Sequence, residues 1–427
     1  MARHSTVALM AKILADITPL RVSPPFRRLW VGHGIANLGQ QMTAVAVGIQ
    51  VYAITNSSLA VGLVGLFQLV PLVTLGLYGG ALSDMHDRRK VALLTALGMW
   101  VCAGAFLLQS MLDFGSVALL YALVAVQSSM YAIGNPARQS IIPRLVKPEL
   151  LPSANALGMI TYNLGFTVGP LLGGLLIAAT GTVTSAYLVD VVAYTAAVWA
   201  MWRLPSLPPE RIENAKPRGG WSQVIEGFRF LKGKRNLQMS FYIDIVAMVF
   251  GMPRALFPAI AVLWYGGDIR QVALVVGLLN AAPAIGALLS GIFSGPLAHI
   301  RRQGLAVVIS VLVWGGSIAA FGLIHWLPFA LFLLALAGAA DNVSAIFRNT
   351  ILQAATPDEY RGRLQGIFTV VVAGGPRAGD VEAGGVAALF GETISVVSGG
   401  LTCILGAVLL LPAFPTFLRY DAHNPTP

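Results

Sequence analysis

The chain has 427 residues, of which 56% are hydrophobic and only 11% are charged, and its mean hydropathy is +0.74. These values exclude a water-soluble protein, because so few polar side chains could not cover its surface. The net charge of +10 does not indicate a nucleic-acid partner, since the basic residues lie between apolar stretches. The composition therefore predicts an all-α polytopic membrane protein rather than a barrel of short alternating strands.

Twelve apolar stretches are long enough for a spanning helix, which needs about 20 residues. In chain order we predict spans at 29–54, 59–83, 91–112, 115–141, 153–179, 183–203, 237–263, 271–298, 304–324, 326–352, 364–390 and 393–417. An even number places both termini on one side, and 25 of the 28 Lys and Arg residues fall in tails or loops of that side, if Arg138, Arg203 and Arg348 at the adjoining span ends are counted with the loops. By the positive-inside rule that side is cytoplasmic, and its basic loops are expected to lie against anionic membrane lipid.

The spans fall into two halves of six. We expect a cytoplasmic lead-in at 1–28, a first half at 29–203, a cytoplasmic linker at 204–236, a second half at 237–418 and a cytoplasmic tail at 419–427. The linker is rich in Pro and Gly and is expected to hold one surface helix, Trp221 to Lys232. Cys102 and Cys403 lie in separate apolar stretches, so we expect neither a disulfide, a metal site nor a cofactor.

Sequence features of the first half recur about 210 residues later. The matching positions are Gly65, Leu66, Pro71 and Gly79 with Gly277, Leu278, Pro283 and Gly291; Arg138, Ile141 and Glu149 with Arg348, Ile351 and Glu359; and Gly165, Gly169 and Gly174 with Gly375, Gly379 and Gly384. Because they recur in the same order along the chain, they indicate a duplicated six-helix unit.

The fifth span carries the pattern G-x3-G-P-x2-G-G, formed by Gly165, Gly169, Pro170, Gly173 and Gly174. Small residues let two helix backbones approach closely in lipid, and the proline bends the helix. The simpler interpretation is a kinked, tightly packed transmembrane helix, which many kinds of membrane protein contain. The pattern resembles the antiporter motif of exporters in the major facilitator superfamily, and this resemblance implies a twelve-helix transporter that works in the direction of export.

The loop after the second span reads Gly-x3-Asp followed by basic residues, at Gly80, Asp84, Arg88 and Arg89. It resembles another signature of the same superfamily, in which the acid and the basic residues latch the two halves together on the cytoplasmic side. The resemblance implies that Asp84 and Arg88 are latch residues. Met85 departs from the signature, where a basic residue is usual, and so does Asp87, where a glycine is usual. A loop that serves topology alone is the alternative.

Four further phrases narrow the resemblance: Ser23 to Leu29, Gly227 to Leu231, Gly291 to His299 and Thr356 to Arg363. In this order along nearly the whole chain they resemble the enterobactin exporter group. That implies a monomeric secondary exporter, driven by protons, that moves a siderophore or similar amphiphile across the plasma (inner) membrane. Macrolide-like multidrug efflux is the alternative, because that branch shares the layout. A receptor with a transporter fold is a third possibility, and no enzyme motif is present.

Polar side chains within spans are costly in lipid and usually face a cavity or a partner helix. Here they gather in the first, fourth, seventh and tenth spans, which line the central cavity in the superfamily. The candidate proton or substrate residues are Asn37, Gln41, Gln127, Asn135, Asp244, Arg254, Asp341 and, in the eleventh span, Asp380. Asp341 lies near mid-membrane by count and is the first choice for a proton carrier, with structural ion pairing as the alternative.

Three of the other candidates also have a structural interpretation. Arg377 and Asp380 share a helix face and are expected to neutralise each other. Asp244, like Asp190, lies nearer a membrane surface and is a candidate ion-pair partner. Arg254 is a candidate cation for an anionic substrate such as a catecholate, or a side chain that reaches the outer interface.

Overall fold

A computed structural model describes residues 16–208, 226, 229–295, 297 and 300–421, and these residues are almost entirely helical. Within the first half of the chain the helices are α2 (Thr18–Val22), α3 (Pro24–Thr55), α4 (Ser58–Met85), α5 (Arg88–Met111), α6 (Val117–Leu145), η1 (Pro148–Leu150), α7 (Leu151–Thr180) and α8 (Thr184–Trp202).

The second half begins with a broken helical run. The run consists of α10 (Arg235–Phe250), η2 (Arg254–Leu256), α11 (Phe257–Ile260) and η3 (Ala261–Tyr265). It is followed by α12 (Ile269–Ile292), α13 (Gln303–Leu323), α14 (Leu327–Ala354), α15 (Asp358–Phe390), α16 (Glu392–Leu410) and η5 (Phe417–Arg419).

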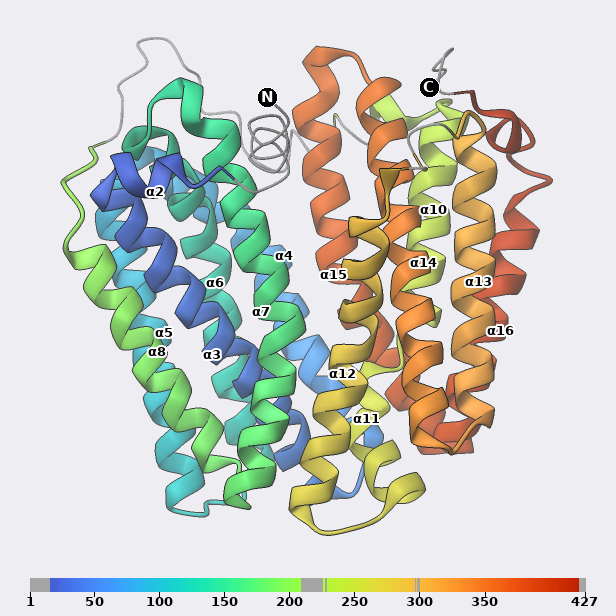
Figure 1. Cartoon of the computed structure of the whole chain (residues 1–427), viewed down its shortest axis with the longest axis horizontal. Coiled ribbons are helices and arrows are strands. Elements are labelled where there is room, and N and C mark those ends of the chain that lie inside the picture. The colour runs from blue at the N-terminus through green and yellow to red at the C-terminus, as the bar shows by residue number, and fades with distance from the viewer. Residues whose placement is uncertain (1–15, 209–225, 227–228, 296, 298–299, 422–427) are drawn as a thin grey trace, which may run out of the picture.

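These helices form two bundles that stand side by side (Figure 1). The first bundle holds α3 to α8 and the second α10 to α16, and the two meet chiefly where α4 packs on α15 and α7 packs on α12. The described residues nearest the termini and the central linker all lie at one end, which we call the linker end. The short turns at 56–57, 112–116, 181–183, 266–268, 324–326 and 391 form the opposite end, which we call the loop end.

Ten helical segments of the described chain are long and apolar enough to cross a membrane. The other two long helices, α3 and α15, have 32 and 33 residues but are more polar. Two predicted spans end early: the eighth stops at Ile292 instead of 298 and the twelfth at Leu410 instead of 417. Only residues 226 and 229–232 of the expected linker helix are described, and most of that prediction lies outside the described residues.

The predicted seventh span is not one helix, because α10 ends at Phe250. Pro253 lacks the N–H that a continuous helix would need, so backbone carbonyls before it lose their partners. The indole Nε1 of Trp314 in α13 donates to the carbonyl of Gly251 at 2.9 Å and satisfies one of them. A side chain at Gly251 would press on that indole, since a Cβ there would lie 3.0 Å from Nε1.

The recurring glycines make equivalent contacts in the two bundles. Within the first bundle, Gly165 and Gly169 of α7 pack against α3, while Gly174 packs across on α12. Their counterparts on α15 repeat this arrangement: Gly375 and Gly379 pack against α10, and Gly384 packs across on α4. The sequence repeat therefore corresponds to a repeat of helix packing, with the same glycines serving one contact inside a bundle and one between bundles.

The close contact between α7 and α12 lies toward the loop end. A Cβ on Gly174 would lie 2.5 Å from the carbonyl oxygen of Ala273 and 2.7 Å from the Cα of Gly277. Gly286, farther along α12, does not take part in this contact, because it packs on Ala335 of α14 within the same bundle.

Two charged side chains of the second bundle reach helix ends of the first. The Arg270 guanidinium donates to the carbonyls of Ala178 and Ala179, at 3.2 and 2.9 Å, in the last turn of α7. Glu392 accepts a 2.8 Å hydrogen bond from Ser58 Oγ at the first residue of α4. A cation at a helix C-terminus and an anion at an N-terminus both complement the helix dipole, so these contacts hold the loop ends together.

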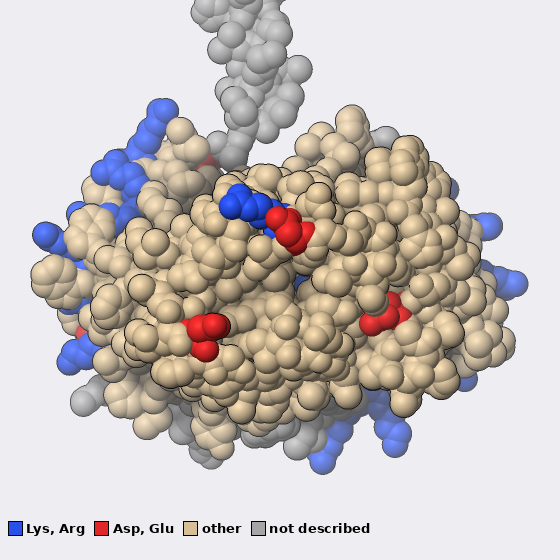
Figure 2. Space-filling model, turned by 90° about the horizontal axis from the view of Figure 1, so that it is seen from below, with Lys and Arg blue, Asp and Glu red and all other residues tan. Residues whose placement is uncertain are grey.

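Figure 2 views the molecule from the loop end. This face is mostly uncharged, with a few separate acidic patches and one small basic patch, while most of the basic side chains in view project from the margins. The loop end of the molecule therefore carries few charged side chains.

Candidate functional site

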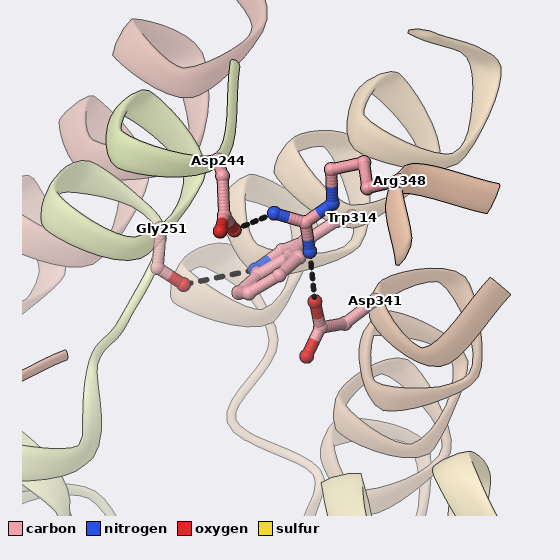
Figure 3. A network of polar contacts seen from close by, with 5 residues as sticks. All are labelled: Asp244, Gly251, Trp314, Asp341 and Arg348. Carbon is pink, nitrogen blue, oxygen red and sulfur yellow. Dashed lines mark hydrogen bonds and ion pairs between the residues drawn. The ribbon is translucent and has the colours of Figure 1, made fainter. Parts of the chain in front are cut away.

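A buried ion-pair cluster joins α10 and α14 in the second bundle (Figure 3). The Arg348 guanidinium forms an ion pair with Asp244 through Nη1, and its Nη2 lies 3.6 Å from a carboxylate oxygen of Asp341. Arg348 and Asp244 are only 2% and 1% exposed, whereas Asp341 is 30% exposed. One arginine thus faces two carboxylates, of which only Asp341 has substantial access to its surroundings.

Arg348 is where the sequence interpretation failed most clearly. It was counted among the basic residues of the cytoplasmic loops, but it lies inside α14, fully surrounded by protein. Asp244, which the sequence left as a candidate ion-pair residue, lies against Arg348. Asp341 lies midway along α14, as its position in the span predicted, and has a partner as well.

The charges of this cluster do not cancel. Two carboxylates and one guanidinium, all ionised, leave one net negative charge in surroundings where an uncompensated charge is costly. Uptake of one proton makes the cluster neutral. Of the two carboxylates, Asp341 is the more accessible, because Asp244 is buried against Arg348, and the guanidinium itself stays protonated.

A second polar cluster lies where α4 meets α15. Arg377 Nε donates to Gln68 Oε1 at 3.2 Å, and its Nη1 donates to the carbonyl of Ala373 one turn earlier. In the described part of the chain no ion pair joins Arg377 to Asp380, so the two side chains do not neutralise each other by direct contact as expected. The Asp380 carboxylate instead lies near the backbone N–H of Ala255 and within electrostatic range of both Arg254 and Arg377.

Two tyrosines of the first bundle lie within electrostatic range of this second cluster. The charges of Arg377 and Arg254 both act on the Tyr162 hydroxyl of α7, and Tyr131 of α6 acts on it as well. With two guanidinium groups and one carboxylate, the cluster carries one net positive charge. Phenol hydroxyls and unpaired cationic hydrogen-bond donors are groups that recognise an anionic aromatic compound.

The predicted amides are dispersed rather than gathered in one site. Asn37 Nδ2 donates to the carbonyls of Thr161 and Tyr162 at 3.3 and 3.5 Å, next to the motif glycine Gly165. Gln41 packs against Gly169. Asn37 and Gln41 thus belong to the contact between α3 and α7. Of the two α6 residues, Asn135 is half-buried, and Gln127 is buried with a side-chain nitrogen that has no partner.

Asp190 has no ion-pair partner among the described residues, in contrast to Asp244. It is fully buried between α3 and α8, where the Thr43 hydroxyl donates to its carboxylate at 2.8 Å. A Cβ on Gly39 would collide with it. Asp190 therefore contributes to helix packing in the first bundle.

The latch motif is described in part. Gly80 and the side chain of Asp84 lie outside the described contacts, so the contacts of the acid are not assigned. Arg88 Nη1 donates to the carbonyl of Ser140 at 3.5 Å, and Arg89 Nη2 donates to that of Trp202 at 2.6 Å. Both arginines thus bind the linker end of their own bundle.

Asp87, which stands where the signature has glycine, binds the start of the linker. It accepts from Ser206 Oγ at 2.6 Å and from the backbone N–H of Leu207 at 3.2 Å, and it caps α5 through the N–H of Arg89. Burial alone would raise the pKa of Asp87, but these hydrogen bonds, with one from the Lys90 backbone, hold it below its ordinary value. This departure from the signature thus anchors the linker.

A sequence profile described as "Transmembrane secretion effector" matches residues 14–423. The chain belongs to this family. As a major facilitator of the transmembrane secretion effector type it is a multi-pass membrane transporter, not an enzyme. The enterobactin exporter EntS of Shigella boydii serotype 18 is 31% identical over 422 residues, covering 96% of this chain and 97% of that one. The protein of the same name from Citrobacter koseri is 29% identical, covering 97% of each chain.

Solved structures show the same fold for this transmembrane secretion effector. The nucleoside transporter NupG superposes with a TM-score of 0.68 at 13% identity, covering 93% of this chain and 100% of the other. A bacterial homologue of the lysosomal transporter Spinster, inward-facing and occupied, gives 0.71 at 15%, covering 93% and 97%. An inward-facing bacterial homologue of ferroportin gives 0.65 at 14%, covering 92% and 98%. Family and fold together identify a membrane exporter.

Proposed function

We propose that the protein is a proton-driven exporter that moves a siderophore, or a similar anionic amphiphile, out across the plasma membrane. The observation that carries the proposal is the pair of clusters with opposite net charge. The Asp244–Arg348–Asp341 cluster is one proton short of neutrality. The cluster of Arg254, Arg377 and Asp380 has one positive charge in excess, which suits an anionic cargo.

The proton step is assigned to Asp341. When Asp341 is ionised, Arg348 is shared between two carboxylates, and when it is protonated Arg348 belongs to Asp244 alone. Proton uptake thus changes how strongly α14 is held to α10 through the same guanidinium. Asp341 lies close enough to Arg348 for this exchange and is the most exposed of the three. Coupling needs a group of this kind, whose charge and contacts change together.

The cargo step is assigned to the cluster at Arg377. Catecholates combine negative charge with aromatic faces, which match two guanidinium groups beside Tyr131 and Tyr162. The relatives that are named enterobactin exporters support this cargo class. Macrolide efflux, the other candidate from the sequence, finds less support here, because macrolides are bulky and not anionic aromatics.

Transport is proposed to proceed by alternating access across twelve spans, with both termini in the cytoplasm. The excess of basic residues at the linker end supports that orientation, because cytoplasmic loops carry most Lys and Arg. The close contacts of α7 with α12 and of α4 with α15 lie toward the loop end, which would then be the outer end. They support an inward-facing arrangement that must separate at these contacts to release cargo outside.

The test is uptake of a catecholate siderophore and, in parallel, a macrolide into inverted vesicles that contain the purified protein. Uptake is compared with and without an acidic vesicle interior for the wild type, Asp341→Asn and Glu382→Gln. Glu382 is a matched carboxylate on α15 that belongs to neither cluster. We expect siderophore uptake that depends on the gradient in the wild type and Glu382→Gln and loses that dependence in Asp341→Asn.

Uptake of the macrolide alone would replace the proposed cargo. Siderophore uptake that is indifferent to the pH gradient would overturn proton coupling, and full coupling in Asp341→Asn would overturn the assignment of the proton site.

A further inference from the structure

The first bundle contains a counterpart of the Asp244–Arg348–Asp341 cluster. Arg138 of α6 stands 210 positions before Arg348, and Tyr131 stands 210 positions before Asp341. The neighbouring helices correspond as well. Gly165 packs on Asn37 of α3, and its repeat partner Gly375 packs on Met248 of α10. His33 precedes Asn37 by four residues, as Asp244 precedes Met248.

The two clusters thus share a layout but not a charge. In the second bundle, the arginine faces two carboxylates. In the first bundle, the equivalent positions hold an imidazole and a phenol. Arg138 lies over the Tyr131 ring at 5.7 Å from its centroid, and its charge acts on the His33 imidazole.

Arg138 is buried without the partner that its counterpart has. It is 9% exposed, and its Nε and Nη2 are buried with no hydrogen-bond partner. Among the residues whose side chains the structure describes, no carboxylate forms an ion pair with it. A guanidinium stays charged in a protein, and buried donors left unpaired are costly, so such a site favours an anion from outside the chain.

We infer that Arg138, with Tyr131, forms a binding site for an organic anion in the first bundle, and that His33 lies beside this site without binding the anion. The anion supplies the negative charge that Asp244 and Asp341 supply in the second bundle, and Tyr131 offers an aromatic face beside it. A carboxylate or phenolate on an aromatic ring fits this set of groups, and so does the phosphate of a lipid headgroup.

The position of the site gives it a role in export, and this part rests on the proposed function. Arg138 follows Tyr131 by seven residues on α6, a rise of about 10 Å toward the linker end. Tyr131 in turn lies within electrostatic range of Arg377. An anion that enters from the linker end would therefore meet Arg138 first and the Arg254 and Arg377 guanidinium groups next.

The test is calorimetric titration of the purified protein in detergent with salicylate, an aromatic carboxylate with a neighbouring hydroxyl. Salicylamide, which has the same shape without the charge, is the ligand control. The variants are Arg138→Gln, which removes the cation, and His33→Asp, which gives Arg138 an internal partner as in the second bundle. His33→Asn is the matched control for His33→Asp.

We expect the wild type and His33→Asn to bind salicylate and not salicylamide. Both Arg138→Gln and His33→Asp should weaken salicylate binding by about tenfold or more, as expected for a lost hydrogen bond to a charged group. His33→Asp should also raise the unfolding temperature, because it pairs a buried cation. Since this variant is expected to gain stability, weaker binding in it cannot be attributed to misfolding.

Equal salicylate affinity in all variants, or no binding of either salicylate or phosphatidylglycerol by the wild type, would overturn the site. A parallel titration with phosphatidylglycerol distinguishes the sources of the anion: if the lipid binds through Arg138 and salicylate does not, the role in export is overturned. Failure of the proposed function can be distinguished from failure of this site. If salicylate binding depends on Arg138 but the protein does not transport siderophore into vesicles, the site stands and the proposed cargo is wrong.

Discussion

Replacing Gly174 with alanine is expected to push α7 away from α12 and so to favour separation of the loop ends. The added Cβ would lie 2.5 Å from the Ala273 carbonyl oxygen and 2.7 Å from the Cα of Gly277. Both are backbone atoms, which cannot move aside without shifting a helix. Overpacking of this kind costs about 1–3 kcal/mol. The gain in helix propensity, about 1 kcal/mol, is the same in both arrangements and cancels from their ratio.

The expected shift follows from that cost. A penalty of about 1–3 kcal/mol on the closed loop end alone changes the ratio of closed to open molecules by about 5- to 150-fold. The assay is the distribution of distances between spin labels placed on the two bundles, at Asp113→Cys and Trp326→Cys, both on exposed loop-end residues. Cys102 and Cys403 are buried and do not compete for the label.

Two alanine variants on the same helix isolate the contact between bundles. A Cβ on Gly158 meets nothing within 4 Å, so Gly158→Ala should leave the distances unchanged. A Cβ on Gly169 meets Gln41 within the first bundle, so Gly169→Ala should lower stability without separating the bundles. If Gly174→Ala keeps the wild-type distance distribution, the contact does not control the loop end and the reasoning is refuted.

Three further predictions concern stability. Arg348→Met leaves Asp244 buried and unpaired and should lower the free energy of unfolding by about 3–5 kcal/mol. Adding Asp244→Leu should restore most of this loss. Thermal unfolding in detergent would contradict the prediction if the double variant is no more stable than Arg348→Met alone. Trp314→Phe keeps the ring but leaves a buried carbonyl without its donor, a loss of about 1–3 kcal/mol that a neutral result in the same assay would refute. The lowered pKa of Asp87 means that its contacts stabilise the protein fully above pH about 4 and are lost as the pH falls through the folded-state pKa. The difference in unfolding temperature between wild type and Asp87→Asn should therefore shrink at acidic pH. A difference that stays constant would mean that the contacts of Ser206 and Leu207 with residue 87 do not require an ionised carboxylate.

The glycine pattern could be read from the sequence because its physical demand is local. Gly165, Gly169 and Gly174 recur at helical spacing, and a backbone that approaches this closely accepts no larger side chain. The contacting surface on the second bundle was not predictable in the same way. Gly277 and Gly286 lie on one helix with similar neighbours, and only the crossing of two helices decides which of them meets α7.

Charges near helix ends were the other limit of the sequence. Arg348 lies six residues before the end of α14, where a basic side chain in a single sequence is most simply taken as a loop or interfacial residue. Its burial depends on Asp244, which is about a hundred residues away and on another helix. Asp341, in contrast, could be placed by counting, because α14 is continuous from Leu327 to Ala354.

The break after Phe250 has a mechanical consequence for the two charge clusters. Asp244 and Arg254 are ten residues apart, and in an unbroken helix a rod of about 15 Å would fix their separation. Here Gly251, Met252 and Pro253 interrupt the rod between them. Asp244, which pairs with Arg348, therefore lies on one side of this helix break. Arg254, which lies near Asp380, is on the other side. A change of the helix angle at this break would therefore change the distance between the two clusters.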